Sequence, residues 1–454
     1  MLRETETKYG RVRGIEAADP RITAYKGIPF AAPPTGELRW RAPRAPKAWD
    51  GVRECYRFAP ISVQDTPGLG DDLYCREWHV DPDIEMSEDC LYLNVWTPAR
   101  NKDERLPVVV WFFGGAFQWG YTSEMEFDGE RIARRGIVFV SVNYRLAALG
   151  FMTHPDLIRN QRDECADFGL LDQQAGLRWV RDNIAYFGGD PDNVTIAGQS
   201  AGGGSVMSQI AYPGNEGLFS KAIIQSGIVC GPDGSSIFKP EPLAQAAKKG
   251  EEFLEVLGVK TVEEARKLDA LYIRDRYAKY CGEDYSQGGF KRRFMTVLDD
   301  RFATMDPYEA VAAGRCNNVP IMAGNTADEF PGMDLEGAIK RLALTRRGNG
   351  VDKPLYYYRL DTDIPGDDKP GNFHSVDLWF FFETLAKCSR HFKGVHYDLA
   401  RVMCDYWCNF VKMGAPMGRA RTGSDMPLWS AYEDWNRVSM VFGSDGAHTV
   451  TDQM

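Results

Sequence analysis

The sequence predicts an α/β fold, a large and mainly parallel sheet with helices on both faces, as a single domain over residues 1–454. Two near-continuous apolar runs, Leu106–Phe113 (LPVVVWFF) and Ile137–Tyr144 (IVFVSVNY), are typical of strands buried on both faces. Apolar residues then recur at helical spacing over Leu170–Phe187, and a short β-rich run follows at Val194–Ala197. Strands and helices that alternate in this order favour a parallel sheet.

The N-terminal part of the chain predicts strands of another kind. Glycines and prolines within residues 10–50 favour short antiparallel strands, followed by a long loop over the surface. Cys90–Thr97 (CLYLNVWT) alternates well enough to form a further strand. Asp190-Pro191 is expected to break the chain just before the strand at Val194–Ala197.

The second half of the chain returns to the sheet several times. Residues 230–315 are polar and helical, with Thr261 and Glu264 spaced as a capping box, and we expect them to form a helical cap over the sheet edge. A second cap insertion is expected over residues 331–352. The remaining strands and the last long helix are expected, in order, at Lys221–Gly227, Val319–Gly324, Pro354–Leu360 and His396–Lys412.

The composition is that of an ordinary soluble protein. Of the 454 residues, 44% are hydrophobic and 26% charged, and the formal net charge is −10. This acidic balance argues against nucleic acid or an anionic membrane as a partner, because both attract basic surfaces. No run of about eighteen apolar residues predicts a membrane span. The N-terminal MLRETETKYG lacks the apolar core of a signal peptide, so we expect a cytoplasmic protein.

The cysteines give no sign of a metal site. The chain has 10 of them and no C-x-x-C pair. Cys404 and Cys408 lie on a predicted helix, but no histidine stands at ligand spacing beside them. We therefore expect reduced, mostly buried thiols, and neither a metal nor another cofactor.

The segment Gly198–Gly202 (GQSAG) carries the strongest chemical signal in the chain. It joins the strand at Val194–Ala197 to small residues that continue to Ser205. A strand that turns sharply into a helix needs glycines where side chains would collide, and it holds its central residue, here Ser200, with the hydroxyl exposed. The helix N-terminus beside this residue favours the negative charge of an oxyanion. Ser200 is therefore the candidate nucleophile.

A serine nucleophile needs a base, which is most often a histidine. His374 lies in KPGNFHSVDLWFF, a loop that follows a late strand and runs into an aromatic helix. A base in such a loop can reach over the sheet edge to the serine. The other five histidines fit surface or capping positions; they are His79, His154, His391, His396 and His448.

A histidine base in turn needs a carboxylate that fixes its tautomer. Asp328 and Glu329 directly follow the strand at Val319–Gly324, and either one fits this role. The chain order of serine, acid and histidine is the order of α/β-hydrolases, and it differs from the order in the two common serine protease folds.

Several long segments, which together span nearly the whole chain, resemble signatures of the type-B carboxylesterases. This family includes cholinesterases and bacterial para-nitrobenzyl esterases, and the resemblance implies the α/β-hydrolase fold. The segments are, in order, YKGIPFAAPPTGELRW (Tyr25–Trp40), SEDCLYLNVWTP (Ser87–Pro98), WFFGGAFQWG (Trp111–Gly120), NYRLAALGF, FGLLDQQAGLRWVRDNIAYFGGDPDNVTIAGQSAGG and GLFSKAIIQSG.

The resemblance implies a role for individual residues. It makes Ser200 the nucleophile, His374 the base and Glu329 the acid, because the family places its glutamate second in the D-E pair. It also implies an oxyanion hole, a supporting hydrogen bond from Ser226 to Glu329, and two structural ion pairs. The oxyanion hole would use the backbone N–H groups of Gly114, Gly115 and Ala201, and the ion pairs would be Arg39 with Glu88 and Arg145 with Asp172.

Two departures from the family concern the site. Gln199 stands where many relatives have glutamate, so one negative charge beside the nucleophile is missing. The tryptophan that binds cationic substrates in cholinesterases has no clear match, because Trp78 is out of register. Both differences argue against choline esters as substrates. The stretch from Glu329 to His374 is also short, which implies a trimmed cap and a more open gorge.

A third departure concerns a family disulfide. Cys90 matches one of its cysteines, but Ser62 stands at the partner position. Cys55 or Cys75 could substitute as the partner, although a free thiol at Cys90 is the simpler interpretation. This and the trimmed cap favour a bacterial cytosolic enzyme.

The leading hypothesis is a carboxylic ester hydrolase that acts on small to medium acyl or aryl esters through a Ser-His-Glu triad and an acyl-enzyme. Its expected partner is a small-molecule ester. Alternatives are an esterase for acetylated or feruloylated carbohydrates and a non-catalytic cholinesterase-like binding module. Phe117, Trp119 and Trp379 could stack on a sugar or an aryl group, although we favour them as gorge lining.

Overall fold

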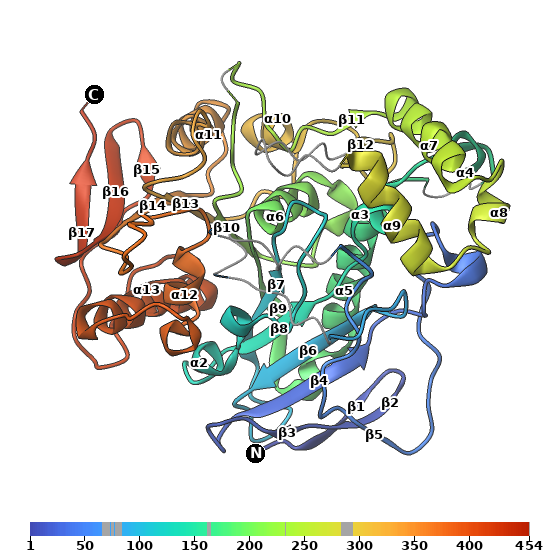
Figure 1. Cartoon of the computed structure of the whole chain (residues 1–454). Coiled ribbons are helices and arrows are strands. Elements are labelled where there is room, and N and C mark those ends of the chain that lie inside the picture. The colour runs from blue at the N-terminus through green and yellow to red at the C-terminus, as the bar shows by residue number, and fades with distance from the viewer. Residues whose placement is uncertain are drawn as a thin grey trace.

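The computed structural model describes residues 1–65, 73, 77, 84–160, 165–231, 233–282 and 294–453 (Figure 1). Its centre is a 12-stranded sheet. From one edge to the other the strands are β15 (Tyr432–Glu433), β16 (Asn436–Gly443), β14 (Leu355–Asp361), β13 (Ile321–Thr326), β10 (Lys221–Gln225), β9 (Gly189–Gln199), β7 (Leu106–Phe112), β8 (Val138–Val142), β6 (Tyr92–Thr97), β4 (Thr23–Pro29) and β3 (Ile15–Glu16), and β17 (Gly446–Thr451) pairs with β16.

The sheet is parallel in its middle and antiparallel at its edges. All neighbours from β16 through β14, β13, β10, β9 and β7 to β8 are parallel. The outer strands β15, β17, β6, β4 and β3 pair antiparallel. The α/β fold with a mainly parallel sheet is thereby confirmed. Two small sheets flank the large one: β1 (Glu4–Thr7) with β2 (Gly10–Arg13) and β5 (Val52–Glu54), and β11 (Glu241–Pro242) with β12 (Val297–Leu298).

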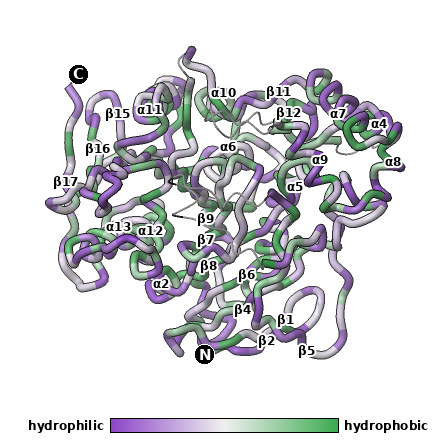
Figure 2. Tube along the Cα trace, viewed as in Figure 1, coloured by the Kyte–Doolittle hydropathy of each residue, from purple (hydrophilic) through white to green (hydrophobic). Residues whose placement is uncertain are grey.

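Alternating side chains of β7 explain why the sheet lies inside the molecule. Val108, Val110 and Phe112 belong to one hydrophobic cluster, whereas Val109 and Trp111 belong to the other. Successive side chains of a strand point to opposite faces, so a strand buried on both faces must be apolar at every position. The hydrophobic colouring follows these central strands in Figure 2.

Helices supply the other half of each cluster. Side chains of α5, α6 and α11 pack in the cluster of Val110, and side chains of α12 and α13 pack in the cluster of Trp111. The helices are α2 (Glu130–Ala133), α3 (Ala147–Phe151), α4 (Pro155–Asn160), α5 (Phe168–Asn183), α6 (Ala201–Ala211), α7 (Leu243–Leu257), α8 (Val262–Ala265), α9 (Ala270–Cys281), α10 (Pro307–Ala312), α11 (Glu336–Gly348), α12 (Asp377–Phe381) and α13 (Gly394–Met413).

The strand that leads to Ser200 is longer than the sequence predicts. β9 starts at Gly189 and includes Pro191, where a break in the chain is expected. Leu106 pairs with Gly189 but Val108 pairs with Val194, so the register shifts between them. The residues in between bulge out of the ladder of hydrogen bonds. A bulge tolerates a proline, because its missing N–H is not needed for strand pairing there. The predicted break is therefore wrong as an end of the strand and takes the form of a bulge.

Residues 230–315 contain α7, α8, α9 and α10, and the first three lie together at the upper right of Figure 1. Thr261 caps α8 by accepting a hydrogen bond from the backbone N–H of Glu264 at 3.2 Å, as predicted. The Glu264 carboxylate accepts from the backbone N–H of Lys260 instead of returning to Thr261. The second expected cap insertion, residues 331–352, contains α11, which packs against β13, β14 and β15.

Both ion pairs implied by the family resemblance are present. Arg145 contacts Asp172 at 2.7 Å, and Arg39 contacts Glu88 at 2.6 Å. Arg39 also donates to the carbonyl oxygens of Ala265 and Leu268, so it ties the segment of α8 to the body of the sheet. A buried pair of this kind is costly to break, because one charge would remain without its partner.

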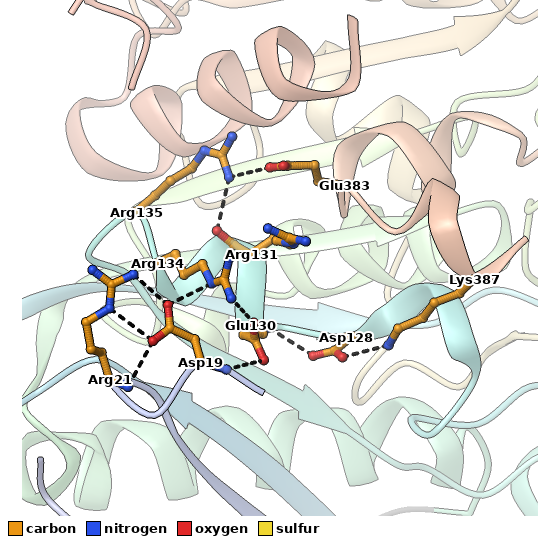
Figure 3. A network of polar contacts seen from close by, with 9 residues as sticks. All are labelled: Asp19, Arg21, Asp128, Glu130, Arg131, Arg134, Arg135, Glu383 and Lys387. Carbon is orange, nitrogen blue, oxygen red and sulfur yellow. Dashed lines mark hydrogen bonds and ion pairs between the residues drawn. The ribbon is translucent and has the colours of Figure 1, made fainter. Parts of the chain in front are cut away.

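A second polar network joins distant parts of the chain (Figure 3). Asp19, just before β4, pairs with Arg134 at the end of α2. The neighbouring Arg135 pairs with Glu383 at 2.8 Å, just after α12. The N-terminal strands are thereby connected, through α2, to the helix that follows the His374 loop.

Within the described parts of the chain, no helix has both the length and the apolar character that crossing a membrane requires. Each of the nine cysteines that the structure describes carries a free thiol. Burial raises the pKa of the Cys90 thiol, and the neighbouring Ser62 hydroxyl acts in the opposite direction. Cys75 lies outside the described residues, together with Trp78 and His79.

Candidate active site

Ser200 lies at the sharp turn between β9 and α6, as the sequence predicts. Its backbone φ of 55° and ψ of −124° place it outside the regions that a serine ordinarily occupies. A Cβ atom on Gly202 would collide with the carbonyl oxygen of Phe112, and one on Gly198 would collide with that of Gly202. The backbone N–H of Ser200 donates to the carbonyl oxygen of Gln225 at 2.8 Å. Close packing of three strand ends thus holds the turn in its strained conformation.

His374 and Glu329 meet at the end of the sheet. The distance from His374 Nδ1 to Glu329 Oε2 is 2.5 Å. Ser226 Oγ donates to the other carboxylate oxygen at 2.6 Å, and the backbone N–H of Thr326 donates to the same oxygen at 3.0 Å. Burial acts to raise the pKa of Glu329, but the His374 ring and these two donors outweigh it, so the pKa is lowered. Glu329 is therefore held as a carboxylate against the imidazole.

Asp328 has a different position. Its carboxylate accepts from the backbone N–H of Asn372 at 2.7 Å, and its backbone N–H donates to the carbonyl oxygen of Asn372 at 3.0 Å. It fastens the loop that carries His374 but does not contact the ring. Of the two carboxylates that the residue pattern leaves open, the structure brings Glu329 to His374.

Gln199 contacts the other nitrogen of His374. Its Nε2 lies 3.2 Å from His374 Nε2 and donates to Ser375 Oγ at 2.6 Å. An amide nitrogen can donate hydrogen bonds but cannot accept them. His374 Nε2 must therefore be the acceptor, and the ring proton must lie on Nδ1, facing Glu329. This is the tautomer in which Nε2 can take a proton from a serine. Ser200 Oγ itself has no hydrogen-bond partner among the described residues.

The loop after β7 presents unpaired backbone donors beside the serine. Three consecutive N–H groups, of Gly114, Gly115 and Ala116, have no acceptor in the described parts of the chain. A Cβ atom on Gly114 would lie 3.1 Å from Cβ of Ser200, which shows how closely the loop approaches. Ala201, the first residue of α6, has an N–H without a partner inside its helix. Ala116 could not be predicted, because its left-handed φ of 58° at a non-glycine residue cannot be read from the sequence.

The aromatic residues proposed to bind substrate differ in exposure. Phe117 and Trp379 are fully buried in the hydrophobic core. Trp119 is partly buried. A further aromatic residue, Phe330, which no sequence motif indicates, packs on the His374 ring with centroids 4.4 Å apart, and 40% of its surface is exposed. The structure thus puts Phe330, immediately after the acid, against the candidate base.

Two of the other histidines cap helices. Nδ1 of His154 accepts from the backbone N–H of Asp156 at the start of α4, and Nδ1 of His396 accepts from that of Lys393 at the start of α13. His391 and His448 are exposed. These four fit the predicted capping and surface positions. The described residues contain no group of three or more histidine, cysteine or acidic side chains that could hold a metal ion.

Comparison with known proteins agrees with this geometry. The model of a family described as the carboxylesterase family matches residues 2–340. The chain belongs to the carboxylesterase family. It is therefore a carboxylesterase, an enzyme that hydrolyses carboxylic esters.

This carboxylesterase resembles named esterases over nearly its whole length. It is 31% identical to a para-nitrobenzyl esterase of Bacillus subtilis (strain 168), over 97% of this chain and 94% of that protein. It is 35% identical to a fumonisin B1 esterase of Sphingopyxis macrogoltabida, over 98% of this chain and 86% of that one. A solved PNB esterase superimposes with a TM-score of 0.82 at 27% identity, over 100% of this carboxylesterase and 98% of the other chain. The fold is accordingly that of the α/β-hydrolases.

Proposed function

We propose that the enzyme hydrolyses small to medium acyl or aryl esters, with Ser200 as nucleophile, His374 as base and Glu329 as acid. The observation that carries the proposal is the 2.5 Å contact between His374 Nδ1 and Glu329 Oε2. With the ring proton on Nδ1, Nε2 carries a lone pair, which accepts from the Gln199 amide in this structure and takes the serine proton in the proposed reaction. The histidine loop, the carboxylate and the strained serine turn follow the carboxyl ends of β14, β13 and β9, with β10 between the last two, and this edge is where α/β sheets bind their ligands.

The proposed reaction has two halves. Ser200 Oγ attacks the ester carbonyl carbon while His374 Nε2 takes the hydroxyl proton, and Glu329 stabilises the resulting imidazolium. The alcohol leaves with that proton, and the acyl group remains on Ser200. A water molecule then repeats the attack, one of its protons passes to His374, and the acid leaves as His374 gives that proton to Ser200 Oγ.

The negative oxygen of each tetrahedral intermediate needs donors that already point at it. We propose the backbone N–H groups of Gly114, Gly115 and Ala201 for this oxyanion hole, with that of Ala116 as a further candidate. The unpaired amides of this loop and the approach of Gly114 to Ser200 support the assignment. Losing one such donor commonly lowers kcat by about a hundredfold or more.

The test is hydrolysis of para-nitrophenyl esters from acetate to decanoate by the wild type and Ser200→Ala, with Ser220→Ala as a control outside the site. We expect Ser200→Ala to lose activity and Ser220→Ala to keep it. A Ser200→Ala variant as active as the wild type would overturn the assignment. The dependence of activity on acyl chain length measures how long an acyl chain the pocket accepts. Para-nitrobenzyl esters, suggested by the name of the Bacillus relative, and acetylated or feruloylated sugars complete the panel.

A location in the reducing cytoplasm is a further part of the proposal. Nine free thiols support it, six of them buried in the two main hydrophobic clusters. Protein purified without reductant and then denatured should react with 10 equivalents of a thiol reagent, one for each cysteine. A smaller number would indicate disulfides and an oxidising compartment.

A further inference from the structure

We infer that Gln118 and Tyr277 are positioning residues, which use contacts with the cap to hold the proposed oxyanion loop in shape. The inference rests on the proposed function, since it concerns the donors beside Ser200. Neither residue lies next to the serine, the base or the acid in the chain. Gln118 is in the loop itself, and Tyr277 is on α9 of the cap.

The backbone of the loop is strained. Gly115, Ala116 and Phe117 have φ values of 98°, 58° and 62°, so three consecutive residues are left-handed. A left-handed conformation is easy for glycine but unfavourable for alanine and still more so for a bulky phenylalanine. Such a segment persists only where its surroundings hold it.

Part of the support comes from within the loop. The carbonyl oxygen of Gly115 accepts from the backbone N–H groups of Gln118 and Trp119, each at 2.9 Å. In a trans peptide the C=O and N–H bonds point in opposite directions, so the N–H of Ala116 points away from this turn. The direction of that donor thus depends on the position of Gln118.

The Gln118 side chain connects the turn to the cap. Its Nε2 donates to the carbonyl oxygen of Phe294 at 3.1 Å and, more weakly, to that of Ala116 at 3.4 Å. Its Oε1 accepts from the Tyr277 hydroxyl at 3.0 Å. The same hydroxyl accepts from the backbone N–H of Phe294 at 3.2 Å. These bonds form a closed ring in which Gln118 is held by two segments of the cap.

This ring is buried. Gln118 is 5% exposed, Tyr277 7% and Phe294 1%, and the rings of Tyr277 and Phe294 stack with centroids 5.4 Å apart. Away from water, a fully bonded polar network is rigid, and the loss of one member leaves its partner without a bond. A separate clamp, Gln64, bonds both backbone groups of Gly120 and so holds only the far end of the loop. The strained middle is held by the cap through Gln118 and by α3 through the backbone N–H of Ala147, which donates to the carbonyl oxygen of Phe117 at 2.8 Å.

The experiment compares Tyr277→Phe with Tyr280→Phe. Tyr280 is on the same helix, but its hydroxyl bonds to Glu252 and to the carbonyl oxygen of Lys249, away from the loop. Both changes remove one hydroxyl and keep the ring. We expect Tyr277→Phe to lower kcat about tenfold with little change in KM, because a shifted donor affects the transition state more than the bound ester. Tyr280→Phe should match the wild type.

The decisive readout is a trifluoromethyl ketone, whose adduct with a serine carries an oxyanion. Its affinity should fall in Tyr277→Phe by the same factor as kcat. A wild-type kcat in this variant, an equal loss in Tyr280→Phe, or a loss of kcat with unchanged ketone affinity would each overturn the inference. Gln118→Met breaks the ring at its other member. If both residues act through one ring, the double variant should lose less than the product of the single losses, and independent effects would contradict the coupling.

These outcomes are separate from those of the proposed function. If Ser200→Ala retains wild-type activity, the nucleophile assignment fails whatever Tyr277→Phe does. If Ser200→Ala is inactive and Tyr277→Phe is fully active, only the coupling of cap and loop fails.

Discussion

The side-chain amide of Gln199 lies 3.2 Å from Nε2 of His374, on the side of the ring away from Glu329. A neutral donor in this place favours the neutral ring with its proton on Nδ1. Many relatives carry a glutamate here, which would instead favour the charged imidazolium. Glutamine in place of glutamate thus affects the charge state of the base without changing the size of the residue beside it.

Gln199→Glu should shift the acidic limb of the pH profile of kcat/KM to higher pH, because a nearby negative charge stabilises the protonated imidazole. Activity would then fall at a pH where the wild type still works. The measurement is kcat/KM for one neutral ester from pH 5 to 9. Gln199→Met, which adds no charge, is the control, and an equal shift in this variant would contradict the electrostatic explanation.

Glu329→Gln should lower kcat by roughly a thousandfold or more, because the amide cannot stabilise the imidazolium. Asp328→Asn is the matched control, since an asparagine oxygen can still accept from the backbone N–H of Asn372. It should keep most of the activity. If Asp328→Asn is the more damaging change, the assignment of the acid is wrong.

Ser226→Ala removes the 2.6 Å hydrogen bond to Glu329. A hydrogen bond to a charged group contributes about 1.5–3 kcal/mol, so kcat should fall about tenfold or more. The pKa of Glu329 is lowered in the folded protein, so its contribution to stability is present above its unfolded pKa and lost as the pH falls through its folded pKa. The variant weakens that lowering, and its acid-unfolding midpoint should move to higher pH. An unchanged midpoint would contradict the linkage.

Asp377 should have the opposite influence on stability. Burial raises the pKa of its carboxyl to about 6, although Tyr358 donates a hydrogen bond to it at 2.9 Å. The folded protein therefore binds this proton more tightly than the unfolded chain, so the contribution of Asp377 to stability is largest below about pH 4 and falls until about pH 6, by roughly 3 kcal/mol. Asp377→Asn should remove this fall in urea unfolding series at pH 4 to 7. Asp398→Asn, an exposed control, should retain it, and a wild-type slope in Asp377→Asn would refute the assignment.

The sequence was sufficient for the parts of the fold that local patterns determine. The apolar run over Leu106–Phe113 matches β7 (Leu106–Phe112) because a strand between two helical layers must be apolar at every position. The helix predicted over His396–Lys412 is α13 (Gly394–Met413), where Gly414 provides the left-handed C-cap. The break predicted at Pro191 was wrong, because a bulge accommodates the proline within the strand.

The site was predictable only where the chain carries a motif. Ser200 and His374 follow from local sequence, but the pattern of residues left Asp328 and Glu329 equal, and the family resemblance decided between them. Phe330, Gln118 and Tyr277 were missed for a physical reason. Their contacts join residues that lie far apart in the chain. Tyr277 and Gln118, for example, are 159 positions apart, and local propensity and periodicity carry no information about contacts over such a separation.

The order of strands in the sheet also determines when the enzyme can first work during folding. Gln199 and His374 are 175 residues apart in the chain, and β10 and β13 must pair before β9 and the histidine loop can meet. Loop closure over such a distance is slow compared with helix formation. On dilution from denaturant, ester hydrolysis should therefore return after the helical signal, and a ribosome-bound chain remains inactive until the segment with His374 has emerged.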